Sequence, residues 1–219
     1  LLRYLRAIYA KRLVSKKEIP NSSSPWESND EMGSSIIEEA RETIQAPDFD
    51  FSASMNAVDP SLIQVSQEVQ SQLRFYVASI GAAYRRENHF HNFHYASHTV
   101  LAVDQMIKKM TCSSNVLQSG FDGVPRSRGE IAKELDSRTF SINSDPIIQF
   151  AIVFSALIQD VDHMGVSNQQ LIKNGSPLST LYMKRCVSEQ NAVDISWWLL
   201  MKEDFDDLRS SIFSNSSER

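Results

Sequence analysis

One apolar segment constrains the fold of this chain more than any other part of its sequence. It begins at Pro146 and reads PIIQFAIVFSALIQDV. The preceding Asp145 is typical of a helix start, since its carboxylate can cap free amide groups while Pro takes the first helical position. The segment is apolar on nearly all sides, so a helix formed by it needs packing partners all round. It is shorter than the ~20 apolar residues that cross a bilayer, and it therefore predicts a buried central helix.

Apolar residues at spacings of three and four predict further helices, and no segment alternates with a period of two. We therefore expect an all-α fold. The long loop of this fold is expected at 112–145, where apolar residues are few and have no period. Helices are expected at 60–84, 92–110, 146–161, 187–201 and 203–213, with short helical pieces around 167–174 and 177–184.

The N-terminal part differs in character from the rest. Residues 1–17 carry six Lys or Arg and no acidic residue, and they predict a basic amphipathic helix. Such a helix either lies on a membrane surface or is a solvent-exposed helix that is the remnant of a linker. Residues 18–48 are rich in Ser, Asn and acidic residues, which predicts a disordered linker. The main domain is then expected at 49–219.

Charge and cysteine content narrow the class of protein. The net charge is −5, which argues against a general nucleic-acid-binding surface, since such surfaces are basic. Only two cysteines are present, so no disulfide framework is expected and a reduced, cytoplasmic setting is favoured. Residues 1–17 leave open a position at the inner face of a membrane. The sequence does not predict an oligomeric state.

Four of the five histidines fall within ten residues, at His89, His91, His94 and His98. On a helix, His94 and His98 lie one turn apart, and His91 lies within about 60° of both. Imidazole is a common metal ligand, and an i, i+4 pair of histidines is a known zinc-binding arrangement. The stripe therefore predicts a metal site. The alternative is a polar surface stripe with no ligand.

A second polar cluster, Gln159-Asp160-Val161-Asp162-His163, ends the apolar helix. A carboxylate at the end of an apolar segment needs a cation or hydrogen-bond donors, because burial penalises its charge. The alternative is a helix end that reaches water, with His163 complementing the helix dipole. Together with the histidine stripe, this cluster predicts a metal cage built between two helices.

At these residues the sequence resembles the catalytic domain of the class I 3′,5′-cyclic nucleotide phosphodiesterases. Residues 88–98 (NHFHNFHYASH) look like the family's N-P-[YF]-H-N-x-x-H-A-x-x-V segment. Residues 157–168 (LIQDVDHMGVSN) look like its H-D-x-x-H-P-G-x-x-N signature. Residues 176–191 look like S-P-L-A-x-x-Y followed by S-V-x-E-x-H. The resemblance covers about 49–213, which corresponds to the N-terminal two-thirds or less of the family domain. The sequence at these residues is similar to that of algal and protist members.

The resemblance implies a multi-helical, HD-type fold and metal-dependent hydrolysis of cAMP or cGMP to the 5′ monophosphate in signal transduction. Family members use two divalent metals, usually zinc and magnesium, which activate water and neutralise the phosphate. His91 matches the histidine that protonates the departing 3′ oxygen. Asp160 matches the carboxylate that bridges both metals. His163 and Asn168 match positions that orient ligands and phosphate, and Phe90 matches the tyrosine beside the acid.

Other positions depart from the family pattern. Tyr95 and Gln159 stand where the family has metal-binding histidines, and Met164 replaces a proline. A phenol binds metal poorly unless it loses its proton, near pKa ~10, and the Gln carbonyl suits magnesium or calcium better than zinc. His94 is a candidate substitute for the ligand at Tyr95, with His98 one turn further on. A later metal-binding aspartate and a purine-binding glutamine of the family lie beyond the end of this sequence.

Three functional interpretations follow for the partial domain expected at 49–219. The first is an enzyme that acts on a cyclic nucleotide. The second is a catalytically inactive relative that serves as a binding or regulatory module, in view of Tyr95 and Gln159. The third is a fragment with no function of its own. The broader HD-type phosphohydrolases fit less well, because the phrases at 176–191 match the cyclic nucleotide family. The choice between cAMP and cGMP is not predicted.

Overall fold

A computed structural model describes residues 1–17, 58–112 and 127–213 of the chain. These ranges contain helices and connecting turns but no strand, which confirms the all-α class. In chain order the α-helices and 3₁₀-helices (η) are α1 (Leu2–Lys17), η1 (Pro60–Leu62), α4 (Gln67–Ala83), α5 (Phe93–Cys112), α6 (Arg128–Arg138), α7 (Pro146–Ile158), α8 (Asn168–Lys173), α9 (Pro177–Leu181), α10 (Val187–Leu200), η3 (Glu203–Phe205) and α11 (Asp206–Ile212).

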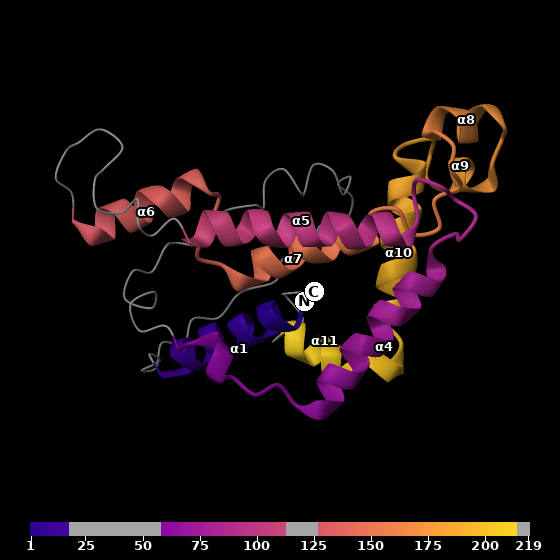
Figure 1. Ribbon diagram of the computed structural model, residues 1–219. Coiled ribbons are helices and arrows are strands. Elements are labelled where there is room, and N and C mark those ends of the chain that lie inside the picture. The colour runs from indigo at the N-terminus through magenta and orange to yellow at the C-terminus, as the bar shows by residue number, and fades with distance from the viewer. Residues whose placement is uncertain (18–57, 113–126, 214–219) are drawn as a thin grey trace, which may run out of the picture.

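Helix α7 lies at the centre, as its apolar sequence predicts. It runs beside α5 and also contacts α1 and α10 (Figure 1). Asp145 caps its first turn by accepting a hydrogen bond from the amide of Ile147 at 2.9 Å. Helix α4 packs against α10 and α11, and α8 and α9 form a small unit at one end of α10. The ends of α5 and α7 that carry the polar motifs therefore belong to a packed helical framework.

Helix α1 is part of this framework. The side chains of Tyr4, Leu5 and Ile8 are almost completely buried in the common core. The Tyr4 hydroxyl donates to Asp104 Oδ1 on α5 at 2.7 Å, and Arg12 donates to two carbonyl groups at the end of α11. The predicted apolar face of residues 1–17 is thus packed against other helices, and it is not free to lie on a membrane surface while it packs in this way.

The predicted loop at 112–145 is wrong in part, because α6 occupies Arg128–Arg138. The start of α6 is a reciprocal cap. Ser127 Oγ accepts from the amide of Glu130 at 3.3 Å, while Glu130 Oε2 accepts from the amide of Ser127 at 2.8 Å. The S-x-x-E pattern that forms such a capping box is present in the sequence. This pattern is the local signal for a helix start that the weak apolar pattern of α6 does not give.

The helix predicted at 60–84 is interrupted near its start. Asp59 caps the 3₁₀ turn η1 by accepting from the amide of Ser61 at 2.8 Å. The chain is then extended until Ser66, whose hydroxyl accepts from the amide of Val69 at 3.2 Å and starts α4. A second cap inside the apolar pattern therefore divides one predicted helix into two elements.

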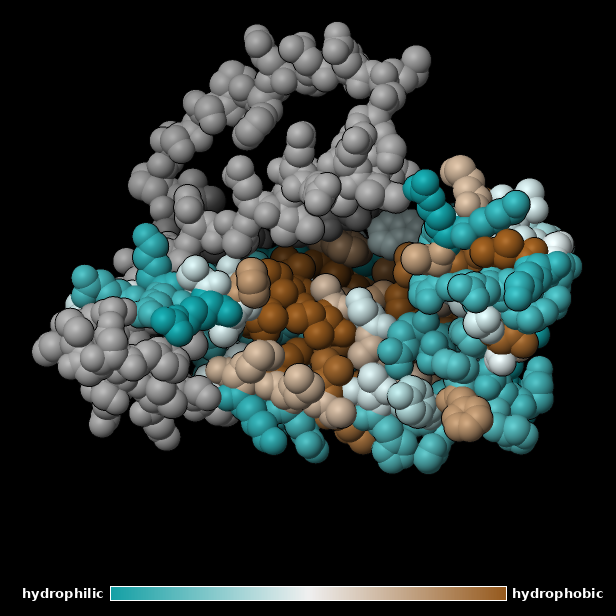
Figure 2. Space-filling model, turned by 90° about the horizontal axis from the view of Figure 1, so that it is seen from above, coloured by the Kyte–Doolittle hydropathy of each residue, from teal (hydrophilic) through white to brown (hydrophobic). Residues whose placement is uncertain are grey.

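The surface that carries α5 is uneven in polarity. Seen from above, apolar side chains gather near the middle of the molecule, and hydrophilic ones gather toward the end where α8 and α9 lie (Figure 2). Leu101 and Met106 on α5 are among the exposed apolar residues. Within the described ranges, no helix combines the length and apolarity that crossing a membrane requires. The predicted linker at 18–48 lies outside these ranges.

Candidate active site

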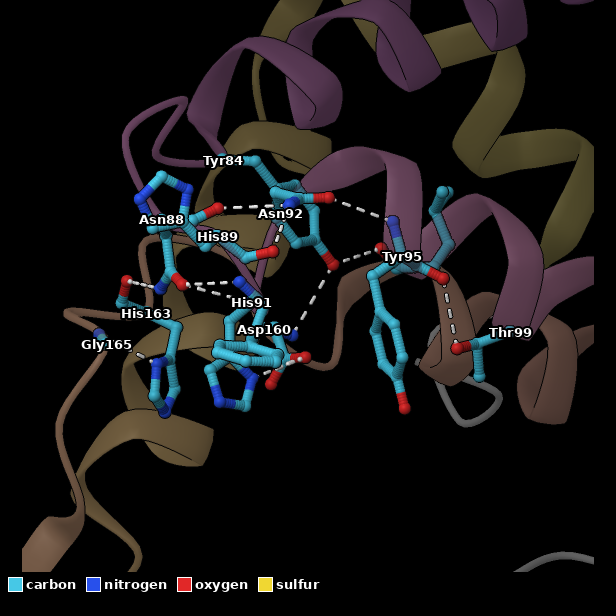
Figure 3. Close-up of polar contacts among 12 residues, drawn as sticks. Tyr84, Asn88, His89, His91, Asn92, Tyr95, Thr99, Asp160, His163 and Gly165 are labelled. Carbon is cyan, nitrogen blue, oxygen red and sulfur yellow. Dashed lines mark hydrogen bonds and ion pairs between the residues drawn. The ribbon is translucent and has the colours of Figure 1, made fainter.

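Three side chains that could hold a metal ion converge where the turn before α5 meets the loop after α7 (Figure 3). His91 comes from the first of these segments, and Asp160 and His163 come from the second. The structure brings the three side chains together, so that one donor atom of each lies within 4.8 Å of the others. The interhelix cluster, as we name His91, Asp160 and His163, is therefore made by two segments that are distant in the sequence.

Within the described ranges, one nitrogen of the interhelix cluster has no hydrogen-bond partner. His91 Nδ1 is buried and lies 3.1 Å from Asp160 Oδ2, but the geometry is not that of a hydrogen bond. The ring of His91 also lies against that of His163, with centroids 3.8 Å apart. A buried polar atom without a partner is costly. A cation bound between His91 Nδ1 and the carboxylate would relieve this cost.

Asn88 ties the two halves of the site together. Its Oδ1 accepts hydrogen bonds from the amides of Phe90 and His91 at 3.1 and 3.0 Å, and its Nδ2 donates to the carbonyl of His163 at 3.1 Å. The amide of Gly165 donates to His163 Nδ1 at 3.0 Å. That bond makes Nδ1 the acceptor, so Nε2 carries the proton of the neutral ring or binds a metal in its place.

The loop after α7 is fixed by a turn at Asp162. Its φ of 56° lies in the left-handed region, which only a few non-glycine residues adopt. Its amide donates to the carbonyl of Ala83 at 3.2 Å, and its carboxylate accepts from Arg85 Nε at 2.8 Å and from Asn191 Nδ2 at 3.2 Å. Three contacts on two other segments hold this turn, and it directs the next residue, His163, into the site.

Tyr84 holds the backbone at Asp160. Its hydroxyl donates to the carbonyl of Leu157 at 2.8 Å and accepts from the amide of Asp160 at 3.4 Å. Burial raises the pKa of Tyr84 to about 12, so the phenol remains protonated at neutral pH. The end of α7 is therefore anchored to the end of α4 beneath the site.

The environment favours the neutral form of His163. Burial lowers the pKa of His163, and the nearby imidazole of His91 lowers it further, while Asp160 and Glu189 act in the opposite direction. A neutral imidazole has a lone pair for a metal, whereas an imidazolium has none. His163 is thus held in the form that can act as a ligand.

Tyr95 and Gln159 are the residues that the resemblance places at the family's metal-binding histidine positions. Tyr95 lies in the first turn of α5, where its amide donates to Asn92 Oδ1 at 3.0 Å and its side chain is 55% exposed. Its ring stands to one side of the clustered residues (Figure 3). Gln159 caps the end of α7 and is partly exposed.

The predicted histidine stripe divides into two groups. His91 faces Asp160, whereas His94 and His98 are exposed and pair with each other on α5, their Nε2 atoms 3.4 Å apart. His94, the candidate substitute for the ligand at Tyr95, is not among the donors of the interhelix cluster. His89 is exposed before the helix.

Asn168 and Phe90 are the two other residues that the sequence predicts for the site. Asn168 begins α8 and links it to α10, because its Oδ1 accepts from the amide of Ser188 and its Nδ2 donates to Glu189 Oε2, both at 2.9 Å. Phe90 is 78% exposed and leaves its ring free on the surface beside His91. Its exposure leaves room for a ligand to stack against the ring.

Several supporting residues were not identified from sequence as part of the site. Asn88 has a local signal, because Asn in a turn often accepts from backbone amides two or three residues ahead. Tyr84 and Asp162 have none, because their partners lie on other segments, 29 to 77 residues away. Such pairings depend on how α4 and α7 pack, which spacing along the chain does not reveal.

The donor set of the interhelix cluster fits a metal ion. Two imidazole nitrogens and one carboxylate oxygen form the type of set that binds catalytic zinc, where a further position stays open. The buried, unpartnered His91 Nδ1 supports this fit. Magnesium prefers oxygen ligands and keeps several waters, and Asp160 is the single carboxylate of this cluster.

Comparisons with known proteins indicate the class of protein. The family model described as 3'5'-cyclic nucleotide phosphodiesterase matches residues 90–219. The chain is 39% identical over 69 residues to 3',5'-cyclic-AMP phosphodiesterase 4C of Rattus norvegicus. This matched segment is 32% of this chain and 12% of that protein. The chain is 40% identical over 60 residues to the Mus musculus protein of the same name, covering 27% of this chain and 9% of that one. The matched part is thus about a tenth of the length of these relatives.

Proposed function

The chain belongs to the 3'5'-cyclic nucleotide phosphodiesterase family, and we propose that it hydrolyses a 3′,5′-cyclic nucleotide to the 5′ monophosphate. The observation that carries this proposal is the interhelix cluster, in which His91, Asp160 and His163 converge within 4.8 Å at the ends of two helices. The named relatives are cyclic-AMP phosphodiesterases, so cAMP is the first substrate to test and cGMP the second. Hydrolysis of the cyclic nucleotide would end the signal that it carries.

We assign proton donation to His91. In the reaction, a water oxygen forms a bond to phosphorus, the bond from phosphorus to O3′ breaks, and O3′ takes a proton. Asp160 Oδ2 lies 3.1 Å from His91 Nδ1 and occupies that side of the ring. The two nitrogens of imidazole have separate roles, so Nε2 is the nitrogen left to donate to the substrate.

We propose zinc as the metal of the interhelix cluster, held by Asp160 together with the imidazole of His163, while His91 keeps the role of proton donor. When bound, a divalent cation supplies positive charge beside the phosphate and lowers the pKa of water. Magnesium is proposed for a second position that uses the Asp160 carboxylate and water. Asn88 and Tyr84 would orient this set, since removing such supporting partners typically costs 10–100-fold in metal affinity or activity.

A second candidate function is a binding or regulatory module without turnover. Tyr95 and Gln159 favour it, because two family histidine positions then offer an exposed phenol and a neutral amide. Such a chain would bind the cyclic nucleotide and leave it intact. Tyr95→His with Gln159→His should then raise zinc affinity, since both changes add imidazoles at the positions where the family binds metal.

We also propose a cytoplasmic location, in keeping with the low cysteine content and the substrate class. Attachment of residues 1–17 to the inner face of a membrane would rely on their Lys and Arg side chains, because the apolar side of α1 packs in the core.

Incubating the purified chain with zinc, magnesium and either cAMP or cGMP tests the main proposal, with product measured by chromatography. We expect 5′ monophosphate from the wild type and none above background from His91→Ala. The exposed His89→Ala is the matched control and should keep the wild-type rate. Equal product from the wild type and His91→Ala would reject hydrolysis by this site. Nucleotide binding measured by calorimetry, without product, would favour the second candidate.

A further inference from the structure

A second histidine pair lies outside the interhelix cluster, on the surface of α5. His94 and His98 are both exposed, and their rings meet with centroids 4.6 Å apart and planes inclined at 64°. Their Nε2 atoms lie 3.4 Å apart. We propose that His94 and His98 form a separate surface site for a divalent transition metal ion, with zinc as the expected occupant.

The distance between the two nitrogens carries this proposal. Zinc binds imidazole nitrogen at about 2.0–2.1 Å and prefers tetrahedral geometry, so two nitrogens on one zinc ion lie about 3.3–3.4 Å apart. The His94 and His98 Nε2 atoms are already at this separation. Binding would therefore need little movement of either ring, and each ring would keep its proton on Nδ1.

The direct contact between the two rings is a weak competitor for the metal. Hydrogen bonds from nitrogen have donor–acceptor distances near 2.9–3.0 Å, and 3.4 Å lies beyond the usual range. Replacing that long contact by a metal therefore costs little. The i, i+4 spacing places both rings on one side of an intact helix, so the site needs no contribution from another element.

The site has two protein ligands and is open. Because no acidic or further histidine side chain joins these two rings in the described ranges, water would complete the coordination, as in sites that keep an open position. Zinc should outbind magnesium here, because imidazole suits zinc and magnesium prefers oxygen. By mass action, a metal that binds the native helix also raises its stability. The first turns of α5, which follow His91, would be stabilised.

Zinc titration with a chromophoric competing chelator tests this site, using the wild type, His98→Ala, His94→Ala and Asp160→Asn. We expect His98→Ala and His94→Ala each to lose one zinc equivalent, or to bind it at least about tenfold more weakly, since even supporting partners of a ligand contribute 10–100-fold. Asp160→Asn should retain this equivalent, because the pair does not use the interhelix cluster. His89→Ala, an exposed histidine without a ring partner, should bind like the wild type.

Thermal unfolding gives an independent measurement. Zinc should raise the Tm of Asp160→Asn, and this shift should disappear in Asp160→Asn with His98→Ala, while magnesium should shift neither. Unchanged zinc stoichiometry and affinity in both His94→Ala and His98→Ala would overturn the proposal. Loss of all zinc binding in Asp160→Asn would also overturn it. Circular dichroism of each variant shows whether α5 remains folded.

Discussion

His91 and His163 come from different segments and meet with ring centroids 3.8 Å apart, whereas His94 and His98 share one helix and meet at 4.6 Å. The first pair is half-buried beside Asp160, and the second is exposed. The second pair needs only that α5 be helical. The first pair needs α5 and α7 to pack in one arrangement. Its chemistry is therefore sensitive to changes in the core.

The surroundings of the two pairs also differ. Burial and a second imidazole lower the pKa of His163, and Asn88, Tyr84 and Asp162 brace the loops that carry the interhelix cluster. The pair on α5 relies on the helix backbone alone. Changes to the core, to Asp160 and to the bracing groups should therefore affect the pair of His91 and His163 and leave the pair on α5 unchanged.

The largest effect is expected from Leu157→Ala. Leu157 is 5% exposed in α7, and such a substitution costs about 2–5 kcal/mol in the free energy of unfolding. Because α7 positions Asp160 and His163, zinc affinity of the interhelix cluster should fall, while the pair on α5 should keep its affinity. Urea unfolding and zinc titration measure both quantities.

The matched control for this change is Leu101→Ala. Leu101 lies on α5 and is 59% exposed, so its truncation should change stability by no more than about 0.5 kcal/mol. If Leu157→Ala were as stable as Leu101→Ala, the prediction that the interhelix cluster depends on core packing would be wrong.

Asp160→Asn should weaken zinc binding at the interhelix cluster by about a hundredfold or more, because the amide keeps the shape but loses the charge, and even outer partners contribute 10–100-fold. Zinc competition in a His98→Ala background isolates this cluster. Asp204→Asn, an exposed carboxylate distant in sequence, removes the same charge and should have no effect. Equal zinc affinity in the two variants would show that Asp160 is not a ligand.

Tyr84→Phe should lower the free energy of unfolding by about 1–3 kcal/mol, because the buried carbonyl of Leu157 loses its donor. The effect depends on pH. The phenol has a pKa of about 12 in the folded chain and about 10 when unfolded, so the folded state keeps a proton that the unfolded state loses. This contribution is full below pH 10 and is lost as pH rises toward 12.

Chemical denaturation at pH 8 and pH 11 measures this dependence. The difference in stability between the wild type and Tyr84→Phe should shrink at the higher pH. Tyr95→Phe removes an exposed phenol and is the matched control, for which a small difference in stability is expected. A difference for Tyr84→Phe that grows with pH would contradict the assignment.

The smallest effect is expected from Gly165→Ala, at about 1–2 kcal/mol. Gly165 has a φ of +77°, and a Cβ there would lie 3.4 Å from Asn88 Nδ2. Gly175→Ala has the same type of backbone, with a φ of +63°, but a Cβ there would meet no atom of the described residues within 4 Å. Both variants should lose similar stability, but only Gly165→Ala should weaken zinc binding at the interhelix cluster. Equal zinc affinity in the two variants would mean that the position of the Asn88 side chain does not depend on the missing Cβ at Gly165.

Much of the fold could be predicted because its signals are local. The Asp-Pro cap and the apolar pattern of 146–158 identify α7, and the i, i+4 spacing identifies the pair on α5. Helix α6 was not predicted, because its apolar pattern is weak and its capping box was the main signal. The long helix at 60–84 was predicted as one element, because the pattern continues across the second cap at Ser66.

The site could be predicted in its composition but not in its arrangement. The motifs around His91 and Asp160 identify the two segments that meet, and their order along the chain supports the family. The helical stripe of histidines does not separate His91 from His94, and only the resemblance matches His91 to the proton donor. Only the turn at Asn88 and the packing of α5 on α7 turn His91 toward Asp160 and leave His94 at the surface.

The sequence by itself determined the all-α class, the central helix and the residues that can bind a metal, because helix caps, apolar spacing and side-chain chemistry act over a few residues. The tertiary structure decided which of those residues meet. It placed α1 in the core, joined His91 to Asp160 and His163, and left Tyr95 outside that cluster. The physical reason is that these contacts depend on the packing of surfaces far apart in the chain, which local rules do not fix.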